Sequence, residues 1–258
     1  MNKFDAEKTA NELTSFLKLS LQGNFKSYLI GVSGGIDSAT SLALAVKAVG
    51  VEHVFPVLMP YGTLSEQGTK DAWLVIDALG ISHEQVHEVD IKPFVDEVAK
   101  YDEMIDPPRL GNIMARMRMV ILYDLAKKYG FKHLVLGTEN LTEHLLGYYT
   151  RFGDEASDVE PLRNLYKYQV SELAKYLGVP DEIITKKPTA GLWEGQTDEG
   201  ELGFSYKKAD EILYLYHEEK LSKEEIMAKG FTSDEVEKVF GWIKIAEFKH
   251  QLPLKPTN

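Results

Sequence analysis

Residues 31–38, with the sequence GVSGGIDS, have the composition of a turn that holds a phosphate group. They follow the apolar run 28–30 and precede a segment of helical composition, so we expect a turn between a strand and a helix. Glycines let the backbone approach an anion closely, and the first amides of a helix point towards it. Neither a Walker A loop, which ends in Gly-Lys-Ser/Thr, nor a dinucleotide fingerprint fits this segment.

Asp37 adds a carboxylate beside the expected phosphates. Two anions placed together repel each other unless a cation lies between them, and Mg²⁺ binds through a few carboxylate and phosphate oxygens. We therefore expect Asp37 to be a magnesium ligand. The alternative is that the two glycines form an ordinary turn and that Asp37 only caps the following helix.

Residues 136–143, LGTENLTE, repeat this order of strand end, glycine, hydroxyl and carboxylates. Glu143 could meet Asp37 across one metal ion, although an acidic residue in a first helical turn also complements the helix dipole.

Residues 147–167 combine glycine, proline, aromatic and charged residues, a mixture that suits a loop closing over a nucleotide. Lys167 at its end could neutralise a phosphate, and the alternative is an ordinary lysine on a helix surface.

Two arginines lie on the helix expected from residue 110. Asn112 and Arg116 are four residues apart and share a face, whereas Arg118 points away from Arg116 by about half a turn. The alternative is a solvated arginine pair without a ligand. Apolar residues of the same helix serve either the core or an interface between subunits, and they are Met114, Met117, Val120 and Ile121.

Residues 186–203 are rich in turn formers and hold an acidic cluster, for which we expect a solvated surface rather than a metal site. The cluster comprises Asp198, Glu199 and Glu201. His133 and His144 have no partner at the spacing of metal ligands, so we expect structural or surface histidines and no zinc chemistry.

Short β-branched or apolar runs alternate with segments of helical period, which predicts an α/β fold with an open parallel sheet flanked by helices, Rossmann-like in type. The expected strands are residues 28–30, 54–58, 85–89 and 134–137. The expected helices are residues 5–21, 38–49, 65–79, 110–129, 167–177, 206–218 and 234–249, with Ser65 as the N-cap of its helix. Ligands of such sheets sit at the carboxyl ends of strands, where both glycine-containing turns fall. We expect one domain over residues 1–258, with a helical, loop-bearing carboxyl region.

The composition excludes several classes of function. The 29 basic and 40 acidic residues give a net charge of −11 without a long basic run, which disfavours nucleic acid as a partner. The absence of cysteine excludes thiolate metal sites and cysteine nucleophiles. Enzymes that draw nitrogen from glutamine commonly use a catalytic cysteine. If this chain forms an amide, its nitrogen therefore comes as free ammonia or from a partner. The first residues have no signal-peptide core and the apolar stretch 39–46 is too short to span a membrane, so we expect a cytoplasmic protein.

The phosphate turn resembles that of ATP pyrophosphatases, a group that includes NAD, GMP, asparagine and argininosuccinate synthetases and tRNA-thiolating enzymes. Further motifs occur in the order seen in NAD synthetases: NIMARMR, GTENLTE, GYYTRFGD, SDVEPL, KPTAGLWEGQTDE and EFKHQLP. From about residue 28 to 253, the chain therefore resembles the ammonia-dependent NAD synthetases. The resemblance implies the adenine nucleotide α-hydrolase type of fold and a homodimer. It also implies a ligase that amidates deamido-NAD (nicotinic acid adenine dinucleotide) with ammonia in the last step of NAD biosynthesis, cleaving ATP to AMP and pyrophosphate through an acyl-adenylate.

The same resemblance implies a role for each matching residue. ATP would be bound by Gly31, Val32, Ser33, Gly34, Gly35, Ile36, Asp37, Ser38, Thr138, Lys167 and Thr189. Deamido-NAD would be bound by Arg116, Arg151, Asp158, Lys249 and His250. Asp37 and Glu143 would hold Mg²⁺, and Asp37, Ser38 and Lys167 would be catalytic. Three positions depart from the family pattern: Arg151 replaces lysine, His250 replaces arginine and Gly191 replaces aspartate.

Two other interpretations stay open from the sequence. The first is another ATP pyrophosphatase, such as a free-standing GMP synthetase subunit or a tRNA modifier, which the later motifs disfavour. The second is a non-catalytic nucleotide-binding module on the same fold. The pairing of Asp37 with Glu143 counts against such a module, because simple adenine binding needs no magnesium clamp.

Overall fold

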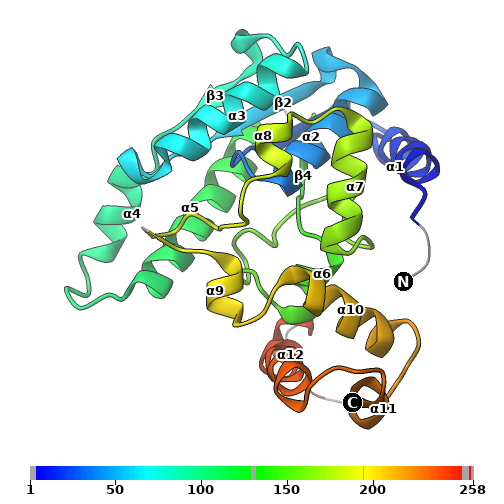
Figure 1. Ribbon diagram of the computed structural model, residues 1–258. Helices are drawn as coiled ribbons and strands as arrows, with labels where there is room; N and C mark the ends of the chain where they lie inside the picture. Colours follow the sequence, from blue (N-terminus) through cyan, green and yellow to red (C-terminus); the bar gives the residue numbers. More distant parts are fainter. Residues whose placement is uncertain (1–3, 129–131, 194, 252–255, 257–258) are drawn as a thin grey trace.

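The computed structural model describes residues 4–128, 132–193, 195–251 and 256. A parallel sheet of four strands in the order β3-β2-β1-β4 lies at its centre (Figure 1). The strands are β1 (Ser27–Gly31), β2 (Val54–Leu58), β3 (His87–Glu88) and β4 (His133–Leu136). In the register of the sheet, Tyr28 lies opposite both Val54 and Leu134. The predicted open parallel sheet is confirmed.

The third strand is shorter than predicted, because residues 83–85 form a 3-10 turn instead of extended chain. Ser82 caps this turn by accepting a hydrogen bond from the Glu84 amide at 3.3 Å. The Gln85 side chain then donates to the Val51 carbonyl at 2.8 Å. Pairing with β2 therefore begins only at His87.

Helices cover the sheet and build the carboxyl region. They are α1 (Ala6–Ser20), α2 (Ile36–Val49), α3 (Glu66–Ala78), α4 (Lys92–Ala99), α5 (Pro107–Lys128), α6 (Leu141–Leu146), α7 (Lys167–Leu177), α8 (Asp181–Ile184), α9 (Asp198–Leu202), α10 (Tyr206–His217), α11 (Lys223–Ala228) and α12 (Ser233–Ala246). A 3-10 helix, Glu247–His250, follows α12. The seven predicted helices are present, with ends that agree within three residues; residue 129 lies outside the described part of the chain.

Two local features differ from the expectations: Ser65 occupies the N-cap position of α3 without a side-chain capping bond, and one helix was not predicted. Ser65 precedes α3, but its hydroxyl accepts a hydrogen bond from the Tyr61 amide at 3.0 Å instead of capping the helix. The chain folds back here through a 3-10 turn, so the hydroxyl faces that turn. Helix α4 was not predicted; it is only eight residues long, and it buries Val95 while leaving Phe94 49% exposed.

The two faces of the sheet bury different side chains, as the alternation of a strand requires. Tyr28 and Ile30 pack with residues of α1, α2, α3 and α7 on one face. Leu29 packs with Val95 and Met114, from α4 and α5, on the other. The sheet is therefore covered on both sides. Because its strands are parallel, their carboxyl ends meet at one edge.

A second apolar cluster, separate from the sheet, holds the carboxyl region together. It joins Leu146 of α6 with Ile212 of α10, Ile226 of α11 and Val236 of α12. These helices lie together at the end of the molecule below α7 in Figure 1. Along the described part of the chain, no helix is both long and apolar enough to cross a membrane.

Candidate nucleotide site

The glycine turn between β1 and α2 depends on close backbone contact with α3. Gly34 has a φ of +79°, and a Cβ atom at this position would lie 2.3 Å from the Gly68 carbonyl oxygen. Only glycine fits both the conformation and the space. Helix α2 is preceded by Gly35, which has no side chain to cap it, so the amides of the first turn are suited to hold an anion.

The hydroxyls of this turn face each other. The oxygen atoms of Ser33 and Ser38 lie 3.2 Å apart, and the Ser38 hydroxyl donates to the Gly35 carbonyl at 3.0 Å. Ser38 is buried while Ser33 is exposed. The turn thus presents backbone amides and a hydroxyl at the carboxyl end of β1.

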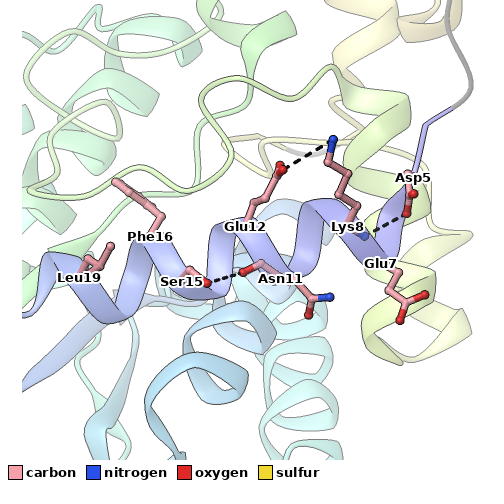
Figure 2. Close-up of a pocket in the computed structure, with 8 residues that line it drawn as sticks. All are labelled: Asp5, Glu7, Lys8, Asn11, Glu12, Ser15, Phe16 and Leu19. Carbon is pink, nitrogen blue, oxygen red and sulfur yellow. Dashed lines mark hydrogen bonds and ion pairs between the residues drawn. The ribbon is translucent and has the colours of Figure 1, made fainter.

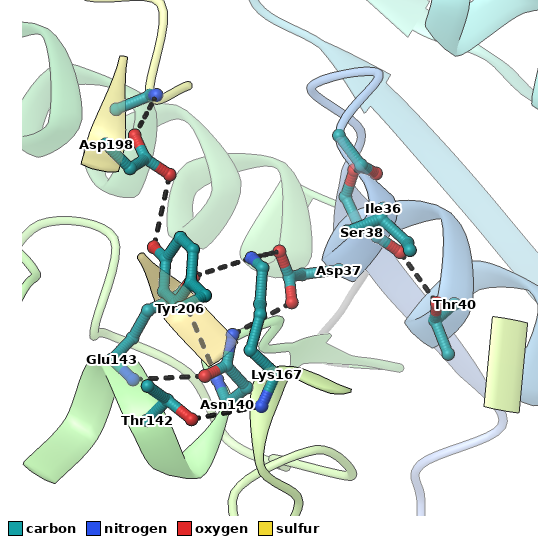
Figure 3. A network of polar contacts seen from close by, with 12 residues as sticks. Ile36, Asp37, Ser38, Thr40, Asn140, Thr142, Glu143, Lys167, Asp198 and Tyr206 are labelled. Carbon is teal, nitrogen blue, oxygen red and sulfur yellow. Dashed lines mark hydrogen bonds and ion pairs between the residues drawn. The ribbon is translucent and has the colours of Figure 1, made fainter. Parts of the chain in front are cut away.

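Asp37 does not cap its helix but binds residues from two distant segments (Figure 3). Its Oδ1 atom accepts a hydrogen bond from Asn140 Nδ2 at 2.9 Å, and its Oδ2 atom lies 2.5 Å from Lys167 Nζ. The same ammonium group donates to Glu143 Oε1 at 2.9 Å. The structure therefore brings together Asp37 and Glu143, with the cation of Lys167 between them.

Local sequence explains how Glu143 reaches this point. Asn140 is the N-cap of α6, and its side chain accepts from the Glu143 amide, while the Glu143 carboxylate accepts from the Asn140 amide. This capping box fixes both side chains at the carboxyl end of β4. Asn140, which was not predicted as a site residue, thus orients Asp37 and Glu143 together. The pattern Asn-x-x-Glu was the available signal in the sequence.

Lys167 is buried, with 7% of its surface exposed, so the alternative of an ordinary helix-surface lysine is wrong. Burial alone would lower the pKa of its ammonium, but the carboxylates of Asp37 and Glu143 outweigh this and raise the pKa. The group therefore stays charged. The pKa of Glu143 is raised by burial and by the nearby Asp37, with Lys167 opposing the change. The ring of Tyr206 covers the ammonium at 4.9 Å from its centroid.

The donor set fits a magnesium ion only in part. Asp37 and Glu143 converge on one cation, which shows that the space between them accepts positive charge. Among the residues that the structure describes, however, no group of three or more histidine or acidic side chains could hold a metal. Mg²⁺ commonly uses one or two carboxylates and completes its shell with phosphate oxygens and water, so two carboxylates are sufficient when a nucleotide is bound.

Residues predicted to bind the second nucleotide gather where the carboxyl end of the chain meets the segment after α6. Lys249 Nζ donates to the carbonyls of Gly147 and Tyr149, each at 2.6 Å. His250 Nε2 lies 2.7 Å from the His144 carbonyl, and Arg151 Nη2 donates to the Gln251 carbonyl at 2.6 Å. The side chains of Lys249, His250 and Arg151 therefore cross-link two segments.

The arginines of α5 diverge, as their spacing predicted. Arg116 is exposed, and its Nε atom lies 3.4 Å from the Arg151 carbonyl. Arg118 instead donates to the Met59 carbonyl at 3.1 Å, and burial lowers its pKa to about 10. Only Arg116 thus approaches the Lys249 region. The apolar residues near these arginines also differ in exposure. Met114 is fully buried, whereas Val120 is 52% exposed.

Of three further predicted residues, Asp158 and Thr189 have side-chain hydrogen-bond partners close to them. Asp158 Oδ2 accepts a hydrogen bond from the Val135 amide at 2.8 Å, so this carboxylate supports β4. Thr189 is exposed and donates to the Gln196 carbonyl at 2.8 Å within its own loop. Thr138 follows β4 in the second glycine turn and is half-buried. In the described chain, none of these three is paired with the Lys167 ammonium.

The acidic cluster was predicted to be a solvated surface, which is wrong for Asp198. This residue is only 5% exposed, and it accepts hydrogen bonds from the Tyr206 hydroxyl at 3.1 Å and the Ala190 amide at 2.9 Å. It begins α9, and Thr197 caps that helix. Asp198 therefore holds the tyrosine that covers Lys167. Glu201 is exposed as expected and accepts from Tyr148 at 2.9 Å.

A buried ion cluster beside β4 was also missed. Glu139 Oε1 lies 2.6 Å from Arg163 Nη1 and 3.2 Å from His144 Nδ1. Glu160 Oε2 lies 3.6 Å from the same Arg163 nitrogen, and Glu160 accepts a hydrogen bond from the Ser157 hydroxyl at 2.6 Å. The pair Glu160–Arg163 is local, but Glu139 and Arg163 are 24 positions apart, so no local pattern of the sequence joined the two halves of the cluster.

A separate surface pocket runs along the outer face of α1 (Figure 2). Its lining residues are Asp5, Glu7, Lys8, Asn11, Glu12, Ser15, Phe16 and Leu19. Asp5 caps the helix by accepting from the Lys8 amide at 2.9 Å. The polar groups drawn there mostly bind one another, and the pocket contains none of the site residues described above.

The chain matches the NAD synthase family over residues 9–253. It is 47% identical to the NH3-dependent NAD+ synthetase of Thermococcus kodakarensis over 259 residues, which cover 99% of both chains. It is 46% identical to the enzyme of the same name from Pyrococcus furiosus over 258 residues, covering 99% of this chain and 96% of that one.

Two solved structures of similar proteins superpose on nearly the whole chain. A structure of NMN synthetase from Francisella tularensis superposes with a TM-score of 0.86 at 34% identity, covering 99% of this chain and 100% of that one. The NH3-dependent NAD synthetase of Campylobacter jejuni superposes with a TM-score of 0.83 at 28% identity, with the same coverage. These matches extend over both the sheet and the carboxyl helices.

Proposed function

Because this chain belongs to the NAD synthase family, we propose that it amidates deamido-NAD with ammonia and cleaves ATP to AMP and pyrophosphate. The observation that carries the site assignment is the buried ammonium of Lys167, held 2.5 Å from Asp37 and 2.9 Å from Glu143 beside the glycine turn. This arrangement brings backbone amides, a cation and two carboxylates to one point. A nucleoside triphosphate requires the amides and the cation for its phosphates and the carboxylates for its metal ion.

The chemistry needs activation of a carboxylate, because its oxygen is a poor leaving group and its charge repels nucleophiles. Attack of the nicotinate carboxylate on the α-phosphorus of ATP would form an acyl-adenylate and release pyrophosphate, and ammonia would then displace AMP. The amides of the turn, the Ser38 hydroxyl and Lys167 would stabilise the charge that moves onto pyrophosphate. One such donor is worth about 3 kcal/mol in the transition state.

Asp37 and Glu143 would hold Mg²⁺ together with phosphate oxygens. When bound, this ion would neutralise charge on the phosphates. Lys167 would then turn its ammonium from the carboxylates towards the phosphate oxygens. Thr138 and Thr189 would complete the ATP site.

Deamido-NAD would bind near Arg116, Arg151 and Lys249, whose cations compensate for the net negative charge of the chain. His250 would contribute beside Lys249. The Asp158 carboxylate has one oxygen bound by the Val135 amide, and it would take part in orienting the dinucleotide. A water molecule or this carboxylate would accept the proton that ammonium loses before attack.

A mononucleotide acceptor is the second candidate. The favouring observation is the TM-score of 0.86 with the F. tularensis protein named NMN synthetase, which exceeds the 0.83 with the C. jejuni protein named NAD synthetase. The two acceptors share the nicotinate carboxylate and differ in the adenylate portion. The activation chemistry would therefore be the same, and only the affinity for the acceptor would differ.

The deciding experiment measures AMP and amide product from the purified protein with ATP, Mg²⁺ and ammonium. Deamido-NAD, nicotinate mononucleotide and xanthosine monophosphate are compared as acceptors, and glutamine is compared with ammonium as nitrogen source. We expect NAD and AMP in equal amounts, with deamido-NAD as the preferred acceptor and glutamine as a poor substitute. Preference for nicotinate mononucleotide would overturn the assignment of the acceptor, and AMP formation with xanthosine monophosphate alone would overturn the reaction.

We also propose a homodimer located in the cytoplasm, with the whole chain acting as one domain. The dimer is proposed from the resemblance to the family, and Val120 of α5, which is 52% exposed, would be available to such an interface. Light scattering of the purified protein tests the dimer. A molar mass that matches a single chain of 29.1 kDa at micromolar concentration would contradict it.

A further inference from the structure

Helix α10 directs two buried polar residues towards α7. Tyr206 and Asp210 are four positions apart, so they lie on the same face one turn from each other. Tyr206 is 5% exposed and Asp210 is fully buried. A buried carboxylate is costly unless hydrogen bonds compensate it, so its partners indicate what it does.

The partners of Asp210 surround the backbone of Lys167. Asp210 Oδ1 accepts a hydrogen bond from the Thr142 hydroxyl at 2.5 Å, and Oδ2 accepts from the Tyr168 amide at 2.8 Å. Thr142 Oγ1 in turn accepts from the Lys167 amide at 3.0 Å. The first amides of a helix have no partner inside the helix, and here they are bound by one carboxylate and one hydroxyl.

Tyr206 holds the other end of the same lysine. Its ring lies 4.9 Å from Lys167 Nζ, and its hydroxyl is fixed by Asp198. One face of α10 therefore contacts both the backbone and the ammonium of Lys167, from a helix that belongs to the second apolar cluster. In this way the carboxyl region, which contributes nothing to the sheet, completes the nucleotide site.

We propose that Asp210 is a positioning residue, which acts through Thr142 to place the Lys167 ammonium for contact with the phosphates of a nucleoside triphosphate. The inference rests on the proposed role of Lys167 in binding ATP. A lysine has a long, flexible side chain, so the position of its ammonium depends on a fixed backbone. Displacement by about 1 Å is enough to lower a rate strongly.

The first test compares two identical substitutions. Thr142→Val and Thr14→Val each remove a buried hydroxyl that donates a short hydrogen bond, at 2.5 Å to Asp210 and at 2.6 Å to the Ala10 carbonyl. Thr14 lies on α1, far along the chain from Lys167. The measured quantity is the affinity for a non-hydrolysable ATP analogue with Mg²⁺, by calorimetry. This measurement needs no acceptor, so it stands even if deamido-NAD is the wrong one.

We expect Thr142→Val to weaken the binding of the analogue about tenfold, the effect of losing one hydrogen bond to a charged group. Thr142→Ser should restore the affinity, because it keeps the hydroxyl. Thr14→Val should lower the melting temperature similarly and leave affinity unchanged. The proposal would be overturned if Thr142→Val and Thr14→Val bound the analogue with equal affinity. It would also be overturned if Thr142→Ser bound the analogue as weakly as Thr142→Val.

The second test asks whether Asp210 acts through Lys167. Asp210→Asn keeps the shape of the side chain but removes its charge, and we expect it to weaken analogue binding about tenfold as well. In the presence of Lys167→Met, the same change should cause no further loss, because residues of one unit are not additive. Losses that add would show that Asp210 acts independently and would overturn the proposal. If the asparagine variant does not fold, Thr142→Val replaces it in the same cycle.

Discussion

Asp37 and Lys167 form a buried ion pair, with Oδ2 and Nζ 2.5 Å apart although the two residues are 130 positions apart in the sequence. The pair joins the first turn of α2 to the first turn of α7. A bond of this kind fixes the relative position of the phosphate turn and the carboxyl region. Removing Lys167 would leave the carboxylates of Asp37 and Glu143 without this cation, whereas removing the charge of Asp37 would leave Lys167 paired with Glu143.

Lys167→Met is therefore expected to destabilise the protein. The change leaves Asp37 and Glu143 close together without a cation, and breaking a buried ion pair from one side costs about 3 kcal/mol or more. Mg²⁺ should raise the melting temperature of the variant more than that of the wild type, because it replaces the lost positive charge. The measurement is thermal unfolding with and without 10 mM Mg²⁺, a concentration of the order used for weak metal sites.

Lys175→Met on the same helix is the matched control. Lys175 pairs with Glu172 at 2.6 Å, but both side chains are about half exposed, at 53% and 52%. Exposed pairs contribute little, so this variant should unfold like the wild type. An equal loss of stability in both variants would contradict the importance of burial at Lys167.

Asp37→Asn is expected to abolish turnover while keeping the fold. The amide can still accept a hydrogen bond from Asn140, but it provides neither a charge for Lys167 nor a good ligand for Mg²⁺. Turnover of ATP to AMP should fall at least about a hundredfold, as when a key electrostatic contact in a site is lost. Asp77→Asn, which alters an exposed pair with His83, should leave turnover unchanged. An active, folded Asp37 variant would remove this residue from the proposed metal site.

Gly34→Ala is expected to distort the phosphate turn. A methyl group would lie 2.3 Å from the Gly68 carbonyl, in addition to the strain of a φ of +79°. Gly178→Ala is the control for the backbone strain without the clash. Gly178 has a φ of +76° and open space around its Cβ position. The control should lose about 1 kcal/mol of unfolding free energy and retain affinity for the ATP analogue. Gly34→Ala should lose more stability and bind the analogue measurably more weakly; equal affinities would show that the turn tolerates the clash.

The sequence predicted the parallel sheet and the segments that meet at its edge, because glycine turns and hydrophobic periods are local signals. From the residues it suggested that Glu143 meets Asp37 and that Lys167 neutralises a phosphate, and the resemblance to a family assigned all three to one site. It did not reveal Asn140, Asp198 or Asp210, since their roles depend on contacts between distant segments. Asp198 looked like part of a solvated acidic run, and only the packing of α9 against Tyr206 buries it.

Burial of the Glu160 carboxylate is expected to make stability depend on pH. Burial raises its pKa to about 7, against the opposing effects of the Ser157 hydroxyl and the Arg163 guanidinium. Arg163 also pairs with Glu139, which in turn lies 3.2 Å from His144 Nδ1, and these residues complete the cluster. The folded state therefore keeps a proton on Glu160 up to a higher pH than the unfolded chain does.

The direction in which stability changes with pH follows from the number of protons that each state binds. Between the ordinary pKa of about 4.5 and the raised pKa of about 7, the folded state binds more protons than the unfolded state, so stability falls as pH rises through this window and then levels off. The largest contribution is about 3 kcal/mol. Glu160→Gln stays neutral at every pH and should remove most of this fall in urea unfolding measured at several pH values. Glu182→Gln, at an exposed position in α8, should keep it. An unchanged pH dependence in the Glu160 variant would show that other groups cause the fall.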